Sequence, residues 1–113
     1  MTVKNVFICG PYRAKDLAGV KANIYIAKQA AIKVARAGHY PVCPHLNTGL
    51  FDFELILQDI PDQVYLDGCL KMLTCCNYLY VVTPDNITSG MKGEIQMAKT
   101  LDIPVIAKVT EIR

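Results

Sequence analysis

The chain has 113 residues, is 52% hydrophobic and carries a formal net charge of +2 with both signs spread along its length. This length and composition predict one domain, residues 1–113, that can bury a core. The chain has no basic block and no apolar run near the roughly 20 residues of a membrane span, so we expect neither nucleic acid nor a membrane as its partner.

The five cysteines are odd in number and show no CxxC spacing, which predicts reduced thiols in a cytoplasmic protein. The first apolar run, 6–9, is too short for the core of a signal peptide. Cys9, Cys43 and His45 could hold a metal only if two strand ends met, and no fourth ligand supports this. We therefore expect neither a metal nor a cofactor.

Apolar runs typical of buried strands alternate with stretches of helical periodicity. In the first long helix the apolar residues recur at steps of three and four, from Leu17 to Val34, and Gly38 ends it. Pro41 predicts an edge position for the second strand, because proline cannot donate to a ladder. The predicted elements are a strand (3–9), a helix (15–37), a strand (40–43), a loop (44–49), a lid-like loop with a helical turn (50–61), a helix (62–75), a strand (78–82), a helix (88–101) and a strand (104–107).

Every connection between strands is long enough for a parallel crossover, which predicts an α/β fold. Right-handed crossovers then give a flavodoxin- or Rossmann-like three-layer domain with strand order 2-1-3-4, in which the tail 108–113 extends the last strand or adds a fifth. Ligands of such sheets bind beyond the carboxyl ends of the strands, where the strand order reverses. The loops expected there are 10–13, 44–48 and 84–90.

These loops hold most of the turn residues and polar side chains that could form a site. Thr88 or Ser89 can cap the last helix, and Gly90 allows a ligand to approach the backbone. Glu94 is expected in the first turn, where the helix dipole keeps a carboxylate ionised, as a nucleophile requires. The alternative is that Glu94 only complements the dipole. The candidate site residues are Gly10, Tyr12, Arg13, His45, Asn47, Asp85, Asn86, Thr88, Ser89, Gly90 and Glu94.

A glutamate at this position could attack the anomeric carbon of a sugar, as in retaining glycosidases. Tyr12 could orient that glutamate and Arg13 could pair with a phosphate. The alternatives are that Tyr12 packs on the sheet edge and that Arg13 is a solvated charge. Likewise, His45 could cap a neighbouring loop and Asn47 could hold a turn.

Three motifs carry a resemblance to a known superfamily: Cys-Gly-Pro-Tyr-Arg-Ala at 9–14, Pro-His-Leu-Asn-Thr at 44–48 and Thr-Ser-Gly-Met-Lys-Gly-Glu at 88–94. With them the chain resembles the nucleoside 2-deoxyribosyltransferase-like superfamily. It looks closest to its small, often phage-borne proteins grouped as domain of unknown function 4406.

The resemblance implies a flavodoxin-like fold and a catalytic glutamate that attacks C1′ of a 2′-deoxynucleoside or its monophosphate. By position that residue is Glu94, and Tyr12 is the tyrosine of the Gly-Pro-Tyr motif. Thr88 matches a hydroxyl residue that contacts phosphate in nucleotide-hydrolysing relatives, and Gly90 matches their glycine. Arg13 would be a phosphate partner by the same analogy. Relatives complete their sites across subunits, which implies a homodimer or a higher homo-oligomer.

The sequence departs from the superfamily at one position. Its enzymes carry a catalytic aspartate on the second long helix, and Cys69 stands at the matching spacing. Asp67 lies two residues earlier, roughly 200° around a helix. Either the helix register brings Asp67 into the site as a catalytic residue, or that role is absent or filled by His45 or Asp85.

Three functions therefore remain open. The leading one is an N-glycosidic bond enzyme, either a nucleoside deoxyribosyltransferase or a deoxynucleotide hydrolase. The second is a non-catalytic module that binds a nucleotide or ADP-ribose, which the cysteine at position 69 favours. The third is a phosphoribohydrolase of the cytokinin-activating type, although its double-glycine phosphate loop is missing here.

Overall fold

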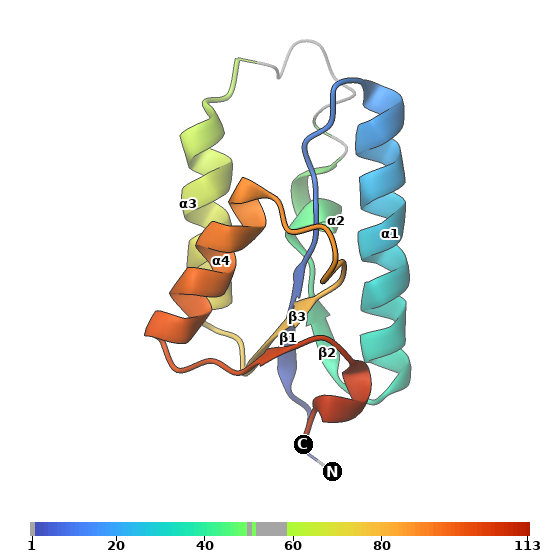
Figure 1. The fold of residues 1–113 in the computed structure, drawn as a ribbon, viewed down its shortest axis with the longest axis vertical. Helices are drawn as coiled ribbons and strands as arrows, with labels where there is room; N and C mark the ends of the chain where they lie inside the picture. The colour runs from blue at the N-terminus through green and yellow to red at the C-terminus, as the bar shows by residue number, and fades with distance from the viewer. Residues whose placement is uncertain (1, 50, 52–58) are drawn as a thin grey trace.

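The fold is a four-stranded parallel sheet between layers of helices (Figure 1). The computed structural model describes residues 2–49, 51 and 59–113. The strands are β1 (Asn5–Cys9), β2 (Tyr40–Val42), β3 (Tyr78–Val81) and β4 (Val105–Ile106). Their order is β2-β1-β3-β4, so the predicted order is confirmed and β2, with Pro41, is an edge strand.

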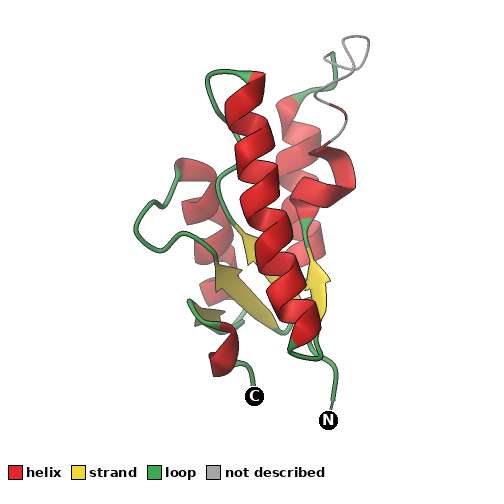
Figure 2. Ribbon diagram, turned by 90° about the vertical axis from the view of Figure 1, so that its right-hand side faces the viewer, coloured by secondary structure: helices red, strands yellow, loops and turns green. Residues whose placement is uncertain are grey.

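The longer helices are α1 (Leu17–Arg36), α3 (Asp62–Leu73) and α4 (Ser89–Thr100). Helix α1 packs against β1 and β2, whereas α3 and α4 pack against each other on the other side of the sheet (Figure 1). Figure 2 shows that α1 extends beyond the strands at one end. None of the helices over the described residues is long and apolar enough to cross a bilayer.

The helix α1 begins where the sequence provides a cap and a small residue. The Asp16 carboxylate accepts a hydrogen bond from the Gly19 N–H at 2.8 Å. A Cβ on Gly19 would lie 2.5 Å from the Ala14 Cβ, so this turn requires glycine. At the other end, Gly38 takes a positive φ of 90° and stops the helix.

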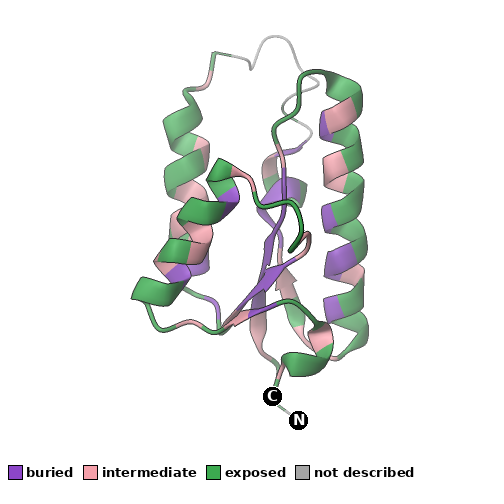
Figure 3. Ribbon diagram, viewed as in Figure 1, coloured by how far each residue is buried: buried purple, intermediate pink, exposed green. Residues whose placement is uncertain are grey.

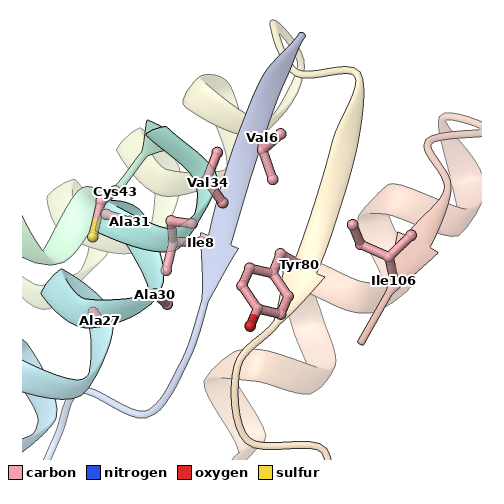
Figure 4. Packing of buried hydrophobic residues seen from close by; sticks show 9 residues of the cluster. All are labelled: Val6, Ile8, Ala27, Ala30, Ala31, Val34, Cys43, Tyr80 and Ile106. Atoms are coloured by element: carbon pink, nitrogen blue, oxygen red, sulfur yellow. The ribbon is translucent and has the colours of Figure 1, made fainter. Parts of the chain in front are cut away.

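The side chains of the strands alternate between the two faces of the sheet and so divide the core in two. Figure 3 shows the buried residues concentrated in the strands and on the sides of the helices that face them. Val6 and Ile8 of β1 face α1 in one cluster, which Figure 4 shows. Phe7 and Cys9 face α3 and α4 in the other cluster. Each central strand is therefore buried on both faces, as expected for a parallel sheet.

Two predictions of local structure are wrong. Residues 44–48 form a short helix, α2 (Pro44–Thr48), because Pro44 suits the first position of a helix. The tail does not extend the sheet but forms a 3₁₀ helix, η3 (Val109–Glu111), in which Glu111 Oε2 accepts hydrogen bonds from the Ala107 and Lys108 N–H groups. The predicted lid at 50–61 lies largely outside the described residues.

Candidate active site

Glu94 lies on the core-facing side of α4. The buried residues Met91 and Ala98 stand three positions before it and four after it, so all three share one face of the helix. Thr88 is the N-cap, and its Oγ accepts from the Met91 N–H at 3.3 Å. Because α4 begins at Ser89, Glu94 falls in the second turn and not in the first, which corrects the prediction.

The environment of Glu94 disfavours its charge. Burial raises the pKa of this carboxyl group from 4.5 to about 7, and a hydrogen bond with Cys9 lowers it only in part. The sequence predicts that a carboxylate here stays ionised, whereas its burial in the structure disfavours the charged form. Desolvation is the larger of the two effects, so the fold favours the neutral acid more than water does.

The charge of this carboxyl group acts on two thiols, and together we call the three residues the Glu94 cluster: Cys9 of β1, Cys69 of α3 and Glu94 of α4. Burial, and then the charge of Glu94, raise the pKa of Cys69 to about 11 and raise that of Cys9 still further. Both thiols are thus protonated at neutral pH. The role of Cys9 could have been found from strand alternation, because it shares a face with Phe7.

The structure brings Cys69 rather than Asp67 to Glu94. Asp67 is exposed, and its Oδ1 accepts a hydrogen bond from Gln63 Nε2 of the same helix at 2.7 Å. The register of α3 is set by Leu73, which is fully buried and lies four residues after Cys69. A register that placed Asp67 in the site would turn Leu73 away from the core.

A second group of side chains gathers after the end of β1, and we call it the Tyr12 cluster: Tyr12, Arg13 and His45. The rings of Tyr12 and His45 meet edge to face with centroids 5.3 Å apart. The Arg13 guanidinium lies 5.7 Å from the Tyr12 ring centre and pairs with Asp62 at 2.7 Å. The loop after β1 and the helix after β2 therefore meet, as the sequence predicts.

His45 fastens the loop that carries Tyr12. Its Nε2 donates to the Pro11 carbonyl at 2.9 Å, which leaves Nδ1 as a buried acceptor without a partner among the described residues. Burial lowers the pKa of this imidazole, so it is neutral at pH 7. His45 therefore caps a neighbouring loop, which is the alternative to a ligand-binding role that the sequence left open.

The chain itself connects the two clusters. Cys9 and Tyr12 are three residues apart, so their Cα atoms lie within about 10 Å of each other. The Tyr12 cluster follows the carboxyl end of β1, and Cys9 of the Glu94 cluster is the last residue of that strand, which together with β3 flanks the point where the strand order reverses.

The loop before α4 is organised by Met91, which sequence reasoning did not single out. Its Sδ accepts from the Thr88 N–H at 3.5 Å and from Thr83 Oγ at 3.8 Å. The thioether thus takes the place of the glutamate in a capping box. The signal for this role in the sequence was the methionine three residues after the capping threonine, Thr88.

The remaining predicted residues have simpler surroundings. Gly10 is buried, and a Cβ there would meet Val82 at ordinary contact distance. Ser89 and Gly90 are exposed in the first turn of α4, and a Cβ on Gly90 would meet nothing within 4 Å. Asn47 and Asp85 are exposed. No three His, Cys, Asp or Glu side chains of the described ranges are grouped closely enough to bind a metal.

The strand order and the helices on both faces of the sheet define a flavodoxin- or Rossmann-like α/β fold. Among solved structures, a 2-deoxyribosyltransferase from the psychrotolerant bacterium Bacillus psychrosaccharolyticus matches with a TM-score of 0.60 over 89% of this chain and 69% of that chain. The two sequences are 14% identical, so this likeness shows a common fold.

Residues 4–108 match the family model described as Domain of unknown function (DUF7768), and the chain belongs to this family. This is a different family from domain of unknown function 4406, the likeness expected from the motifs, which no comparison shows. A search among curated proteins finds no match.

Proposed function

We propose that the chain is an N-glycosidic bond enzyme that acts on a 2′-deoxynucleoside or its 5′-monophosphate, with Glu94 as the nucleophile at the sugar C1′. The observation that carries this proposal is the position of Glu94, which is partly buried beside the end of β1. A carboxyl group that only complemented a helix dipole would remain solvated. The deoxyribosyltransferase fold supports the substrate class.

The reaction requires the ionised form of Glu94. Its carboxylate forms a bond to C1′ while the bond from C1′ to the base nitrogen breaks, and the departing nitrogen takes a proton from water. Water or a second base then takes the sugar, which makes the enzyme a hydrolase or a transferase. Because the pKa of Glu94 is about 7, activity should rise as the pH increases through neutrality.

The residues around this carboxylate suit a sugar phosphate. Arg13 is paired with Asp62, but their side chains are 60% and 76% exposed, and such pairs contribute only about 0–1 kcal/mol. A phosphate group can therefore compete for the guanidinium. Ser89 and Gly90 present their N–H groups at the start of α4, with Thr88 and Asp85 in the same loop. Tyr12 would orient the substrate or Glu94, and Asp67 has no part in the proposal.

The first experiment measures the release of free base from deoxynucleosides and their monophosphates between pH 6 and 8.5, with ribonucleosides as a comparison. We expect release from at least one deoxy substrate, and Glu94→Gln should reduce it by a factor of about 10³ or more. Asp67→Asn is the matched control and should retain activity. If no substrate releases base and none exchanges it for a second base, the enzymatic proposal is wrong.

A pair of glycines provides a test of ligand position. Gly90 and Gly93 are both exposed in α4, and a Cβ on either meets nothing within 4 Å. Alanine at either position should strengthen the helix by roughly 0.5–1 kcal/mol. If the ligand approaches the first turn, Gly90→Ala should weaken binding of a deoxynucleoside monophosphate in calorimetry by about tenfold, whereas Gly93→Ala should not. Equal effects would place the ligand elsewhere.

The second candidate function is a module that binds a nucleotide or ADP-ribose without cleaving it. The observation that favours it is Cys69, whose neutral thiol stands beside Glu94 where the resemblance leads one to expect an acid. This function predicts that the wild-type protein leaves a bound monophosphate intact and that Glu94→Gln binds it equally well. Calorimetry followed by chromatography of the bound ligand distinguishes the two functions.

We also propose a cytoplasmic homodimer. Among the large exposed apolar side chains, Leu17, Tyr25 and Ile26 lie on α1, and Val64 and Leu66 lie on α3. The free cysteines are consistent with a reducing compartment. Light scattering should give about 25 kDa, twice the 12.5 kDa of the chain, and the mass of a single chain would contradict the dimer.

A further inference from the structure

The loop between β1 and α1 carries two residues of the Tyr12 cluster, and two other elements hold it in place. Figure 1 shows that this part of the chain rises from the end of β1 to the start of α1 and runs beside the first turns of that helix. Gly10 and Pro11 are buried, Tyr12 is half-buried, and residues 13–16 are exposed. Tyr12 therefore lies where the loop leaves the interior, and its position depends on what fastens the loop at this point.

Asn23 fastens the loop from α1. It lies in the second turn of that helix, between the buried residues Val20 and Ala27, and so shares the side of the helix that faces the sheet. Its Nδ2 donates a hydrogen bond to the Tyr12 carbonyl at 2.9 Å, in a partly buried position. Because a carbonyl oxygen can only accept, the amide nitrogen of Asn23 and not its oxygen faces Tyr12. The amide has two hydrogens, so a second acceptor can be satisfied without breaking this bond.

The two peptide units on either side of Tyr12 are both held by side chains. His45 Nε2 of α2 donates to the Pro11 carbonyl at 2.9 Å, and Asn23 of α1 donates to the Tyr12 carbonyl. The first carbonyl belongs to the peptide unit before the Tyr12 Cα atom, and the second belongs to the unit after it. Since each unit is planar, restraining both of them restrains φ and ψ of Tyr12. These two bonds therefore set the direction in which the Tyr12 side chain leaves the backbone.

The two helices that supply these donors pack against each other. Gly49, the C-cap of α2, lies against Ile24 of α1, the residue next to Asn23. A Cβ at position 49 would lie 3.0 Å from the Ile24 Cδ1 atom, so the two helices are in close contact there. The loop is thus bound at successive carbonyls to two elements that support each other.

The bond from Asn23 also bears on Arg13. The N–H of Arg13 is part of the same peptide unit as the Tyr12 carbonyl, so a rotation of this unit would displace both residues. The Arg13 guanidinium lies 5.7 Å from the Tyr12 ring centre and 2.7 Å from a carboxylate oxygen of Asp62. The arrangement of the Tyr12 cluster therefore depends on a residue outside that cluster.

We propose that Asn23 is a positioning residue for the site: its hydrogen bond to the Tyr12 carbonyl orients the Tyr12 ring and the Arg13 guanidinium. The catalytic meaning of this inference rests on the proposed function. The orientation itself does not, because it can be measured in the free protein without any substrate.

The experiment measures the nuclear Overhauser effect between the ring protons of Tyr12 and His45, whose ring centroids are 5.3 Å apart. We expect the effect in the wild type and its reduction by about half or more in Asn23→Leu, whose side chain branches at the same atom but has no donor. Asn23→Asp has the shape of the amide and no donor at neutral pH, so it should reduce the effect as well. It replaces the leucine variant if that variant does not fold.

Gln29→Leu is the matched control. Gln29 lies in the same helix but is exposed to solvent, so the same change from an amide to leucine should leave the effect at the wild-type level. The inference is overturned if the wild type shows no such effect, or if Asn23→Leu and Asn23→Asp retain it. It is also overturned if Gln29→Leu reduces the effect as much.

These measurements separate the inference from the proposed function. If base release is absent but the Overhauser effect responds to Asn23 as expected, the proposed function fails and the positioning contact stands. If activity is present, Asn23→Leu should lower kcat/KM by about tenfold or more, because a small displacement of a positioned group is costly. It should also reduce the preference for a monophosphate over the unphosphorylated nucleoside, which a loss of stability alone would not change while the variant is folded. Activity with an unmoved preference and an unmoved Overhauser effect would refute the role of Asn23 alone.

Discussion

Replacing Glu94 with glutamine should stabilise the folded protein above neutral pH. The carboxyl group has a pKa of about 7 in the fold and an ordinary value of 4.5 when it is solvated. A raised pKa means that the folded chain disfavours the charge, so this group costs stability as the pH rises between these two values. The difference corresponds to about 3 kcal/mol at pH 8 and almost nothing at pH 4. Glutamine has nearly the same shape and cannot ionise.

The assay is urea unfolding of wild type and Glu94→Gln at pH 4.5, 6, 7 and 8. The two proteins should have similar free energies of unfolding at the lowest pH, and the variant should gain about 3 kcal/mol over wild type by pH 8, most of it before pH 7. Asp67→Asn, which removes an exposed carboxylate, should stay within about 0.5 kcal/mol throughout. A variant that is equally or less stable than wild type at pH 8 would refute the claim that Glu94 is desolvated.

Three further outcomes follow from the site. Thr88→Ala removes the cap of α4 and should lower the free energy of unfolding by about 1 kcal/mol in thermal or urea unfolding; an unchanged midpoint would contradict the cap. Cys69→Asp places a second carboxylate beside Glu94, so the Glu94 pKa should rise, measured by NMR; a lower or equal value would show that the two side chains do not meet. Asp62→Asn removes the carboxylate that competes with phosphate for Arg13, so it should tighten calorimetric binding of a monophosphate but not of the unphosphorylated nucleoside; equal changes for both would remove Arg13 from the phosphate site.

The layered sheet could be predicted because its signals are local. Apolar runs, the three- and four-residue spacing of α1 and the position of Pro41 each act within one element, and the rules of parallel crossovers then leave few topologies. The meeting of Tyr12 and His45 followed from the same rules, since the carboxyl ends of adjacent strands share one edge.

Packing between elements decided which residue of α3 faces Glu94 and how readily Glu94 ionises. Whether Asp67 or Cys69 faces Glu94 depends on how α3 sits on the sheet, and that is set by the burial of Leu73 against distant residues. The ionisation of Glu94 depends on the water that β1, α3 and α4 together exclude from it, a sum over segments far apart in the chain. The sequence alone determined that an acid stands near the start of the last long helix. Only the tertiary structure decided that this acid is partly buried and that its charge acts on two thiols, because desolvation arises from contacts between segments that the sequence does not place side by side.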